Sequence, residues 1–422
     1  MGPPSKSILQ AEQAAAGVRQ LSILVFVAVV ICLVCAVPPV GVGMAHPQST
    51  EPASQAALER QINAALSQGR SSLAAESLDK LLNEPHLDSA LLLRTGIAFA
   101  QSALFPEAVR AFTRCVRDYP TVFEGHYDLA LAELASGHLA QAYAAIDQAP
   151  HQSEQESTAR IYLRGKIEAG MGRLQLAQQD LSAAFAKDPG RENFALDLGL
   201  VYLQVHAYPQ SERVFAQSSA LNPHSNYLLL GLALTQFLEG RTSQSVESSK
   251  RLLASSPEFS PARLLLGFTL YFDGKFGEAR EVASAGLKLP DPDPYLYYLE
   301  AATLLKQHGR EQAQILDDLT VAEKRIPDCA LCYVASGKVH EEHNELQAAV
   351  GDLEKAVRLA PDLSEGWYHL AAVYTRLGEA AEAVKAREHF QAMKANADER
   401  EKQIMQGVLL ESLGAQSHAG AH

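Results

Sequence analysis

The segment GWYHLAAVYTRLGEAAEAV, residues 366–384, carries the pattern that decides the fold. Trp367, Leu370 and Tyr374 follow one another at spacings of three and four residues, so a helix places them on one face. Gly378 comes after this pattern, where glycine commonly ends a helix, and a second run rich in alanine and glutamate follows. The segment therefore predicts two short antiparallel helices joined by a tight turn.

The same unit recurs along most of the chain at a period of about 34 residues. We expect ten repeats, which start at Gln55, Ser89, Phe123, Thr158, Glu192, Asn226, Ser260, Pro294, Ala330 and Ser364. The third and eighth repeats are one and two residues longer than the others, so their boundaries are the hardest to place.

Two positions of the repeat hold small residues almost without exception. The eighth position, from which only Ile62 departs, holds Gly96, Ala130, Gly165, Gly199, Ala233, Gly267, Ala301, Gly337 and Ala371. The twentieth position holds Ala74, Ala108, Ala142, Ala177, Ser211, Ser245, Ala279, Ala313, Ala349 and Ala383. Small side chains at both positions indicate that the two helices of each hairpin approach closely.

With these columns and this period, residues 55–397 resemble the tetratricopeptide repeat family. The resemblance implies an all-α fold, a right-handed superhelical solenoid of about ten hairpins in which the first helix of each hairpin lines a concave groove. It also implies that the chain binds another protein and is not an enzyme. Glycines in the turns inside the hairpins are expected to adopt the left-handed conformation, at Gly69, Gly137, Gly172, Gly240, Gly274 and Gly378.

The residues before the repeats divide into three parts. A polar, basic lead-in, residues 1–20, comes before LSILVFVAVVICLVCAV, residues 21–37, a run without a charged side chain that stops at Pro38. This run exceeds the core of most signal peptides and only just reaches the length that crosses a bilayer as a helix. Residues 21–45 are therefore either a cleaved signal peptide or a transmembrane anchor. Residues 46–54 are expected to form a linker.

Both alternatives for the N-terminal segment predict the same compartment. The basic lead-in stays inside and the repeats lie outside the cytoplasm, secreted or anchored to the membrane by residues 21–37. The bacterial periplasm is the expected location. After the repeats, residues 398–413 are expected to form an amphipathic capping helix, and residues 414–422 a disordered tail.

The charge balance bears on the kind of partner. Thirty-six basic and 49 acidic side chains give a formal net charge of -13, which repels phosphate backbones, so we expect no nucleic-acid partner. The expected partner is a protein or a peptide. Membrane contact is expected only through the N-terminal segment, if it is uncleaved, and homo-oligomerisation is left open.

No motif for a catalytic residue, a cofactor or a metal ion stands out, and none of these is expected. His340 and His343 are separated by three residues where the zinc-protease motif has four, so we expect them on a solvated helix face. Cys329 and Cys332 form a C-x-x-C at a repeat junction. One interpretation is structural, in which they are small buried residues or form a local disulfide. The other is functional, in which they are a redox or metal-binding pair.

The predicted groove of repeats five to eight is unusually apolar and aromatic. Its positions hold Leu196, Leu200, Leu203, Tyr227, Leu230, Leu234, Phe237, Leu264, Phe268, Tyr271, Tyr295 and Tyr298. These side chains are either buried by neighbouring helices or exposed as a channel for an extended or helical peptide. The family's clamp for a C-terminal carboxylate uses Lys and Asn, and it is unsupported because Leu93, Ile97 and Asp128 occupy that region.

Together these patterns predict a non-catalytic, protein-binding scaffold of the cell envelope that engages its partner along the concave face of the array. The alternative function is that of a redox or metal accessory protein that uses Cys329 and Cys332.

Overall fold

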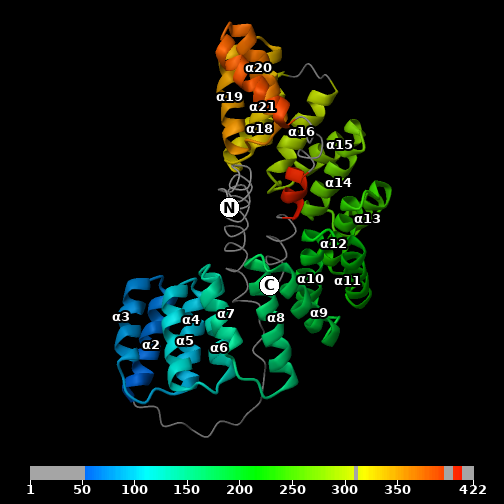
Figure 1. Cartoon of the computed structure of the whole chain (residues 1–422). Helices are drawn as coiled ribbons and strands as arrows, with labels where there is room; N and C mark the ends of the chain where they lie inside the picture. The colour runs from blue at the N-terminus through cyan, green and yellow to red at the C-terminus, as the bar shows by residue number, and fades with distance from the viewer. Residues whose placement is uncertain (1–52, 308–311, 394–402, 411–422) are drawn as a thin grey trace, which may run out of the picture. The chain divides into compact units, whose positions relative to one another are not determined.

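The computed structural model describes residues 53–307, 312–393 and 403–410 (Figure 1). Every regular element within these ranges is a helix, and the described residues contain no strand. The expected all-α fold is therefore confirmed. The chain divides into two compact units, one ending at Asn222 and one beginning at Pro223.

The first unit contains five antiparallel helix pairs. They are α2 (Ala53–Ser67) with α3 (Ser71–Leu82), α4 (Ser89–Gln101) with α5 (Phe105–Asp118), α6 (Phe123–Ala135) with α7 (Leu139–Asp147), α8 (Glu154–Gly170) with α9 (Leu174–Lys187), and α10 (Glu192–Gln204) with α11 (Tyr208–Leu221).

The second unit contains five more pairs. They are α12 (Asn226–Leu238) with α13 (Thr242–Ser255), α14 (Ser260–Phe272) with α15 (Phe276–Gly286), α16 (Tyr295–Lys306) with α17 (Gln312–Arg325), α18 (Ala330–Glu342) with α19 (Leu346–Leu359), and α20 (Ser364–Leu377) with α21 (Ala380–Met393).

The first helix of a pair starts at the predicted residue in seven of the ten repeats. The fourth repeat differs most, because α8 starts at Glu154 and not at Thr158. Ser153 explains the difference: its Oγ accepts a hydrogen bond from the amide of Glu156 at 3.0 Å, and the Glu156 carboxylate accepts the amide of Ser153 at 3.2 Å. This reciprocal cap starts the helix one turn early, next to the repeat that carries an extra residue.

The columns of small residues lie where the two helices of a hairpin meet. A Cβ atom built on Gly199 would lie 2.2 Å from the ring of Phe215, and one on Gly96 would lie 2.4 Å from the ring of Phe112. Glycine at the eighth position therefore makes room for a phenylalanine sixteen residues later. The hydroxyl of Ser211, at the twentieth position, donates to the carbonyl of Gly199 at 3.1 Å, so this polar side chain is satisfied where most repeats have alanine.

The turns inside the hairpins follow the glycine prediction. All six predicted glycines have φ between 67° and 82°, which confirms the left-handed turns. Three other hairpins place Ala103, His206 or Asn344 in the left-handed region, with φ of 56°, 57° and 63°. A Cβ atom is costly in this conformation, so these turns hold strain that glycine would avoid.

Hydrogen bonds between the two ends of a hairpin recur along the array. The Tyr119 hydroxyl donates to the carbonyl of Leu87 at 2.5 Å, and the Asn222 amide donates to the carbonyl of Gly190 at 2.7 Å. In the second unit, the Arg325 guanidinium donates to the carbonyl of Pro292 at 2.8 Å. In each case the donor side chain lies at the end of the second helix and the carbonyl lies just before the first helix of the same hairpin, so the bond ties the two ends of that hairpin together.

Successive first helices contact one another within both units. In the second unit, α12 and α14, α14 and α16, α16 and α18, and α18 and α20 each approach in this way, and no pair of successive second helices in its described residues does so as closely. The second unit therefore curves toward its first helices. We call the side on which successive first helices meet the first-helix face.

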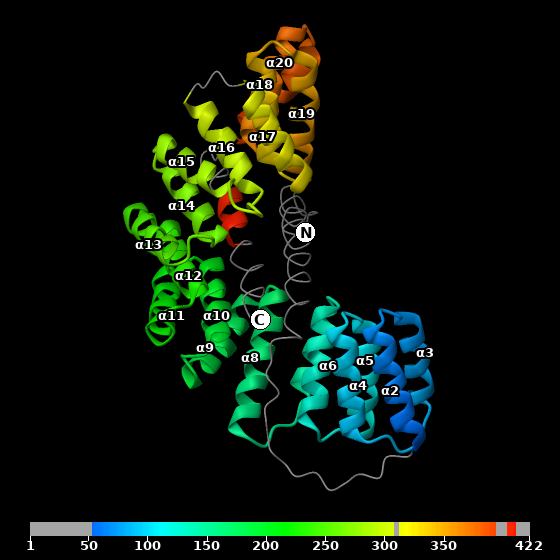
Figure 2. The same ribbon diagram turned by 180° about the vertical axis from the view of Figure 1, so that it is seen from behind.

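A short helix, residues 403–410, follows the last hairpin in sequence and belongs to the second unit. We expected a cap on the last hairpin over residues 398–413. In Figures 1 and 2 this helix, coloured red, lies beside α14 and α16 and away from the outer end of α20. Its side chains Met405, Val408 and Leu409 are buried.

The predicted lead-in, the signal peptide or anchor at residues 21–45, and the tail at residues 414–422 lie outside the described residues. Among the helices that are described, none has both the length and the apolar character needed to cross a membrane.

Candidate binding surface and disulfide

The twelve predicted groove residues lie on α10, α12, α14 and α16, and we call them the apolar stripe. Leu200, Tyr227 and Tyr295 are half-buried. The other nine are buried, namely Leu196, Leu203, Leu230, Leu234, Phe237, Leu264, Phe268, Tyr271 and Tyr298. Burying a side chain of this size contributes about 1.5–3 kcal/mol to stability. This burial favours the packing alternative at the nine positions, and a partner-binding role for the stripe stays a prediction.

Neighbouring first helices supply part of this packing in the second unit. The rings of Phe268 on α14 and Tyr298 on α16 have centroids 6.4 Å apart, and Phe237 on α12 approaches Phe272 at 6.0 Å. These distances lie within the range of favourable aromatic contacts. The stripe in this unit is therefore a row of side chains that contact one another from helix to helix.

The same repeat positions are exposed on other first helices. Ile97 on α4, which occupies the ninth position of its repeat, is 38% exposed, and Tyr368 on α20, at the fifth position, is 53% exposed. Large apolar side chains that remain exposed at these positions are available to a partner. They offer better contacts for docking than the buried members of the stripe.

A polar network in the first unit was not predicted from the sequence. The Tyr162 hydroxyl on α8 donates to the Asp197 carboxylate on α10 at 2.5 Å, and the Lys166 ammonium lies 3.2 Å from the same carboxylate. Tyr162 and Lys166 are buried. Burial, followed by the charge of Asp197, raises the pKa of Tyr162 well above its ordinary value. The network ties α8 to α10 on the first-helix face.

Lys166 gave a signal that could have revealed this network. It occupies the ninth position of its repeat, where neighbouring repeats have Leu131 and Leu200. A lysine in an apolar column needs a carboxylate within reach, because an unpaired buried charge is costly. Asp197, which lies 31 residues later, is such a group.

The pKa of the Asp128 carboxyl group on α6 is strongly raised. Burial, followed by the nearby charge of Glu124, raises the pKa of Asp128 to about 7. Burial also raises the pKa of the neighbouring Tyr127 to about 12. The Asp128 carboxyl therefore changes its charge near neutral pH.

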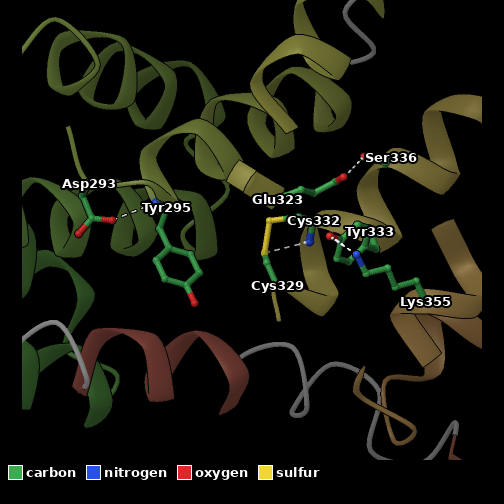
Figure 3. The surroundings of a disulfide bond; sticks show 8 residues. All are labelled: Asp293, Tyr295, Glu323, Cys329, Cys332, Tyr333, Ser336 and Lys355. Carbon is green, nitrogen blue, oxygen red and sulfur yellow. Dashed lines mark hydrogen bonds between the residues drawn. A yellow bond between two sulfur atoms is a disulfide. The ribbon is translucent and has the colours of Figure 1, made fainter. Parts of the chain in front are cut away.

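Cys329 and Cys332 form a disulfide at the start of α18 (Figure 3). The Sγ of Cys329 also accepts a hydrogen bond from the amide of Cys332 at 3.2 Å, so Cys329 caps the helix. Both cysteines are buried. Thiol exchange requires an attacking thiolate to reach a sulfur atom, and burial restricts that access. The redox alternative stays a prediction.

The groups around the disulfide pair with one another. The Lys355 ammonium donates to the Tyr333 hydroxyl at 2.6 Å and lies 4.0 Å from the centroid of the Tyr333 ring. The Ser336 hydroxyl donates to the Glu323 carboxylate at 2.7 Å (Figure 3). Burial, followed by the charge of Glu323, raises the pKa of Asp352 on α19 to about 6. The Asp352 carboxyl group therefore changes its charge near pH 6.

The two histidines of α18 do not converge on one point. His340 lies 2.5 Å from the Glu345 carboxylate through Nδ1, whereas His343 lies 2.8 Å from the carbonyl of Val339 through its own Nδ1. Among the residues that the structure describes, no group of three histidine, cysteine, aspartate or glutamate side chains is arranged to hold a metal ion.

Comparison with known proteins finds a family model and curated relatives that match parts of the chain. A tetratricopeptide repeat family model matches residues 93–157. Human tetratricopeptide repeat protein 13 is 26% identical over 178 residues, which is 39% of this chain and 20% of that protein. The comparisons support the tetratricopeptide repeat family. Tetratricopeptide repeat proteins generally act as protein-interaction scaffolds, and the fold is typically non-catalytic.

Other relatives of this chain are more distant or much longer. The superkiller complex protein 3 of Mus musculus is 29% identical over 131 residues, which cover 29% of this chain and 8% of that protein. The crystal structure of the APC/C hetero-tetramer Cut9-Hcn1 is 12% identical, with a TM-score of 0.37 over 86% of this chain and 94% of that chain. The chain spans at most a fifth of the two curated relatives described here.

Proposed function

We propose that this tetratricopeptide repeat chain is a non-catalytic scaffold of the cell envelope that binds a partner protein or peptide along its first-helix face. The contact of successive first helices within each unit carries the proposal, because it joins short helices into a surface longer than one hairpin offers. Ile97 and Tyr368, which are large and exposed on this face, are the expected contacts with the partner.

The envelope location rests on the N-terminal sequence. Residues 21–37 carry no charged side chain and follow a basic lead-in. A reporter enzyme that is active only outside the cytoplasm, fused after His422, should therefore be active. Replacing Val27 and Val30 with aspartate should abolish that activity, because charges in the apolar run oppose insertion. An inactive unmutated fusion, together with an active cytoplasmic reporter, would show that the topology is wrong.

The binding role is tested by affinity capture from detergent-solubilised envelopes. The full chain should enrich a defined protein over an unrelated bait, as quantified by mass spectrometry. Replacing Tyr368 with glutamate should reduce that enrichment without changing the melting temperature, because this side chain is 53% exposed. Val384, a comparably exposed apolar residue on the second helix α21, is the matched control position. Equal loss for Tyr368→Glu and Val384→Glu would count against the first-helix face.

A further inference from the structure

The helix at residues 403–410 has an apolar face that is already buried in this structure. Met405, Val408 and Leu409 are buried, and their spacing of three and then one residue puts them on one side of the helix. The sequence QIMQGVLL carries no charge. The helix lies beside α14 and α16 in Figures 1 and 2, and it belongs to the same compact unit as they do.

The fifth and ninth repeat positions are buried on α14 and α16, whereas the fifth position is exposed on α20. The fifth repeat position is 53% exposed at Tyr368 on α20, but 0% exposed at Leu264 on α14 and 5% exposed at Tyr298 on α16. The ninth position on α14, Phe268, is also buried. Leu230 on α12 and Val334 on α18 are buried at the same position, so neighbouring first helices supply much of this burial, and α20 is the last first helix of the array.

The C-terminal helix lies next to this row of buried side chains. In Figure 3 the ring of Tyr295, at the start of α16, points toward the helix at residues 403–410. We propose that residues 403–410 are an internal ligand of the first-helix face formed by α14 and α16. This face takes an amphipathic helix with apolar residues at the same spacing as Met405, Val408 and Leu409, and the internal helix must leave before a partner helix can bind.

The internal helix is suited to being displaced. Gly407 weakens it, since glycine is unfavourable inside a helix, and a Cβ at this position would meet no atom within 4 Å. Residues 394–402 join it covalently to α21, so it competes for the face as part of the same chain. A weak ligand can therefore stay bound until a tighter one competes.

This inference rests on the proposed function, because an internal ligand matters only if the face binds a partner. It is tested first in the full chain by hydroxyl-radical footprinting with mass spectrometry. The substitutions Met405→Asp and Leu409→Asp together place two charges on the buried side and should release the helix. Modification of Tyr298 should then rise several-fold, while Tyr368, which is exposed in either state, should stay unchanged.

The matched control places two charges on the other side of the same helix. Gln403→Asp and Gly407→Asp together should leave the modification of Tyr298 unchanged, because these positions lie roughly opposite the buried side chains on a helical projection and a Cβ at position 407 would meet no atom within 4 Å. Circular dichroism of each variant checks that the array remains folded. If Tyr298 is modified to the same extent in the released variant and in the wild type, residues 403–410 do not cover this face and the proposal is overturned.

The second measurement uses a dye-labelled peptide with the sequence of residues 398–413, followed by fluorescence anisotropy. It should bind the released variant at least tenfold more tightly than it binds the wild-type chain, whose face is occupied. A Gly407→Ala peptide should bind about fivefold more tightly than the wild-type peptide, because alanine favours the helix. A rise in Tyr298 modification without peptide binding would also overturn the proposal, because the face would then not accept a helix.

The two proposals fail in different ways. If no envelope protein is captured while the footprint and the peptide behave as expected, the scaffold function fails and the internal ligand stands as a structural feature. If the wild-type chain captures a partner while the footprint of the released variant is unchanged, only the internal ligand fails.

Discussion

Replacing Gly199 with alanine tests the packing of the hairpins at one atom. The new Cβ would lie 2.2, 2.6 and 2.7 Å from three ring atoms of Phe215. Phe215 is fully buried, so its ring cannot swing into solvent. Overpacking of this kind costs about 1–3 kcal/mol. Alanine recovers about 1 kcal/mol through its higher helix propensity. Three overlapping atoms favour the upper part of the range, and we expect a net loss of about 1–2 kcal/mol.

The loss should be local to the hairpin of α10 and α11. Hydrogen exchange of peptides from these two helices measures it directly, since stability in an array is a sum of local terms. Gly351→Ala is the matched control, because that glycine also lies inside a helix, α19, but a Cβ there meets no atom within 4 Å. The control should raise the local stability of α19 by up to about 1 kcal/mol, measured as slower amide exchange in that helix.

A double substitution separates the clash from other effects. Phe215→Leu removes the ring, so Gly199→Ala should cost less in that background, by at least about 0.5 kcal/mol. If Gly199→Ala instead slows exchange in α10 and α11, as Gly351→Ala should in α19, the close approach of the two helices is not the reason for glycine at the eighth repeat position.

Three further substitutions each test one feature of the structure. Folding raises the pKa of Asp128 from 3.8 to about 7, so the folded chain holds an extra proton between these pH values, and its stability falls as the pH rises through them. Asp128→Asn should therefore raise the melting temperature relative to wild type at pH 8 and change it little at pH 4. The same change in melting temperature at both pH values would show that burial does not raise the pKa of this carboxyl. Ser153→Ala removes the cap of α8 and should lower the local stability of its first turn by about 1 kcal/mol, measured as faster amide exchange. Unchanged exchange there would mean that the cap does not stabilise the helix. Ala103→Gly relieves a left-handed turn with φ of 56° and should stabilise the hairpin of α4 and α5 by about 0.5–1 kcal/mol by hydrogen exchange, with a loss of stability counting against strain at this residue.

Most of the fold was predictable because the same residue types recur at the same positions of successive repeats. The starts of seven first helices and all six left-handed glycines follow from a period and from residue types whose backbone preferences are strong. The start of α8 was misplaced because Ser153 and Glu156 form a local cap that outweighs the register of the repeat.

The candidate site was less predictable, because it depends on contacts between repeats. The repeat pattern could identify the residues of the apolar stripe, but it could not predict whether their side chains are buried or exposed. That depends on how neighbouring helices pack over each one. Lys166 and Asp197 pair across two successive first helices. The only sequence signal for this pair was a lysine at a repeat position where neighbouring repeats have leucine. The repeat pattern could not predict where residues 403–410 dock, because an uncharged amphipathic helix can pack on any apolar face that it can reach.

The central claim is that a partner is engaged along the first-helix face, and footprinting of the captured complex tests it most directly. With the partner bound, Ile97 on α4 and Tyr368 on α20, both exposed in the chain alone, should lose modification at one or both positions. Leu176 on α9 and Val384 on α21 are equally accessible on second helices and should be unaffected. Protection of Leu176 and Val384, with Ile97 and Tyr368 unchanged, would contradict the account.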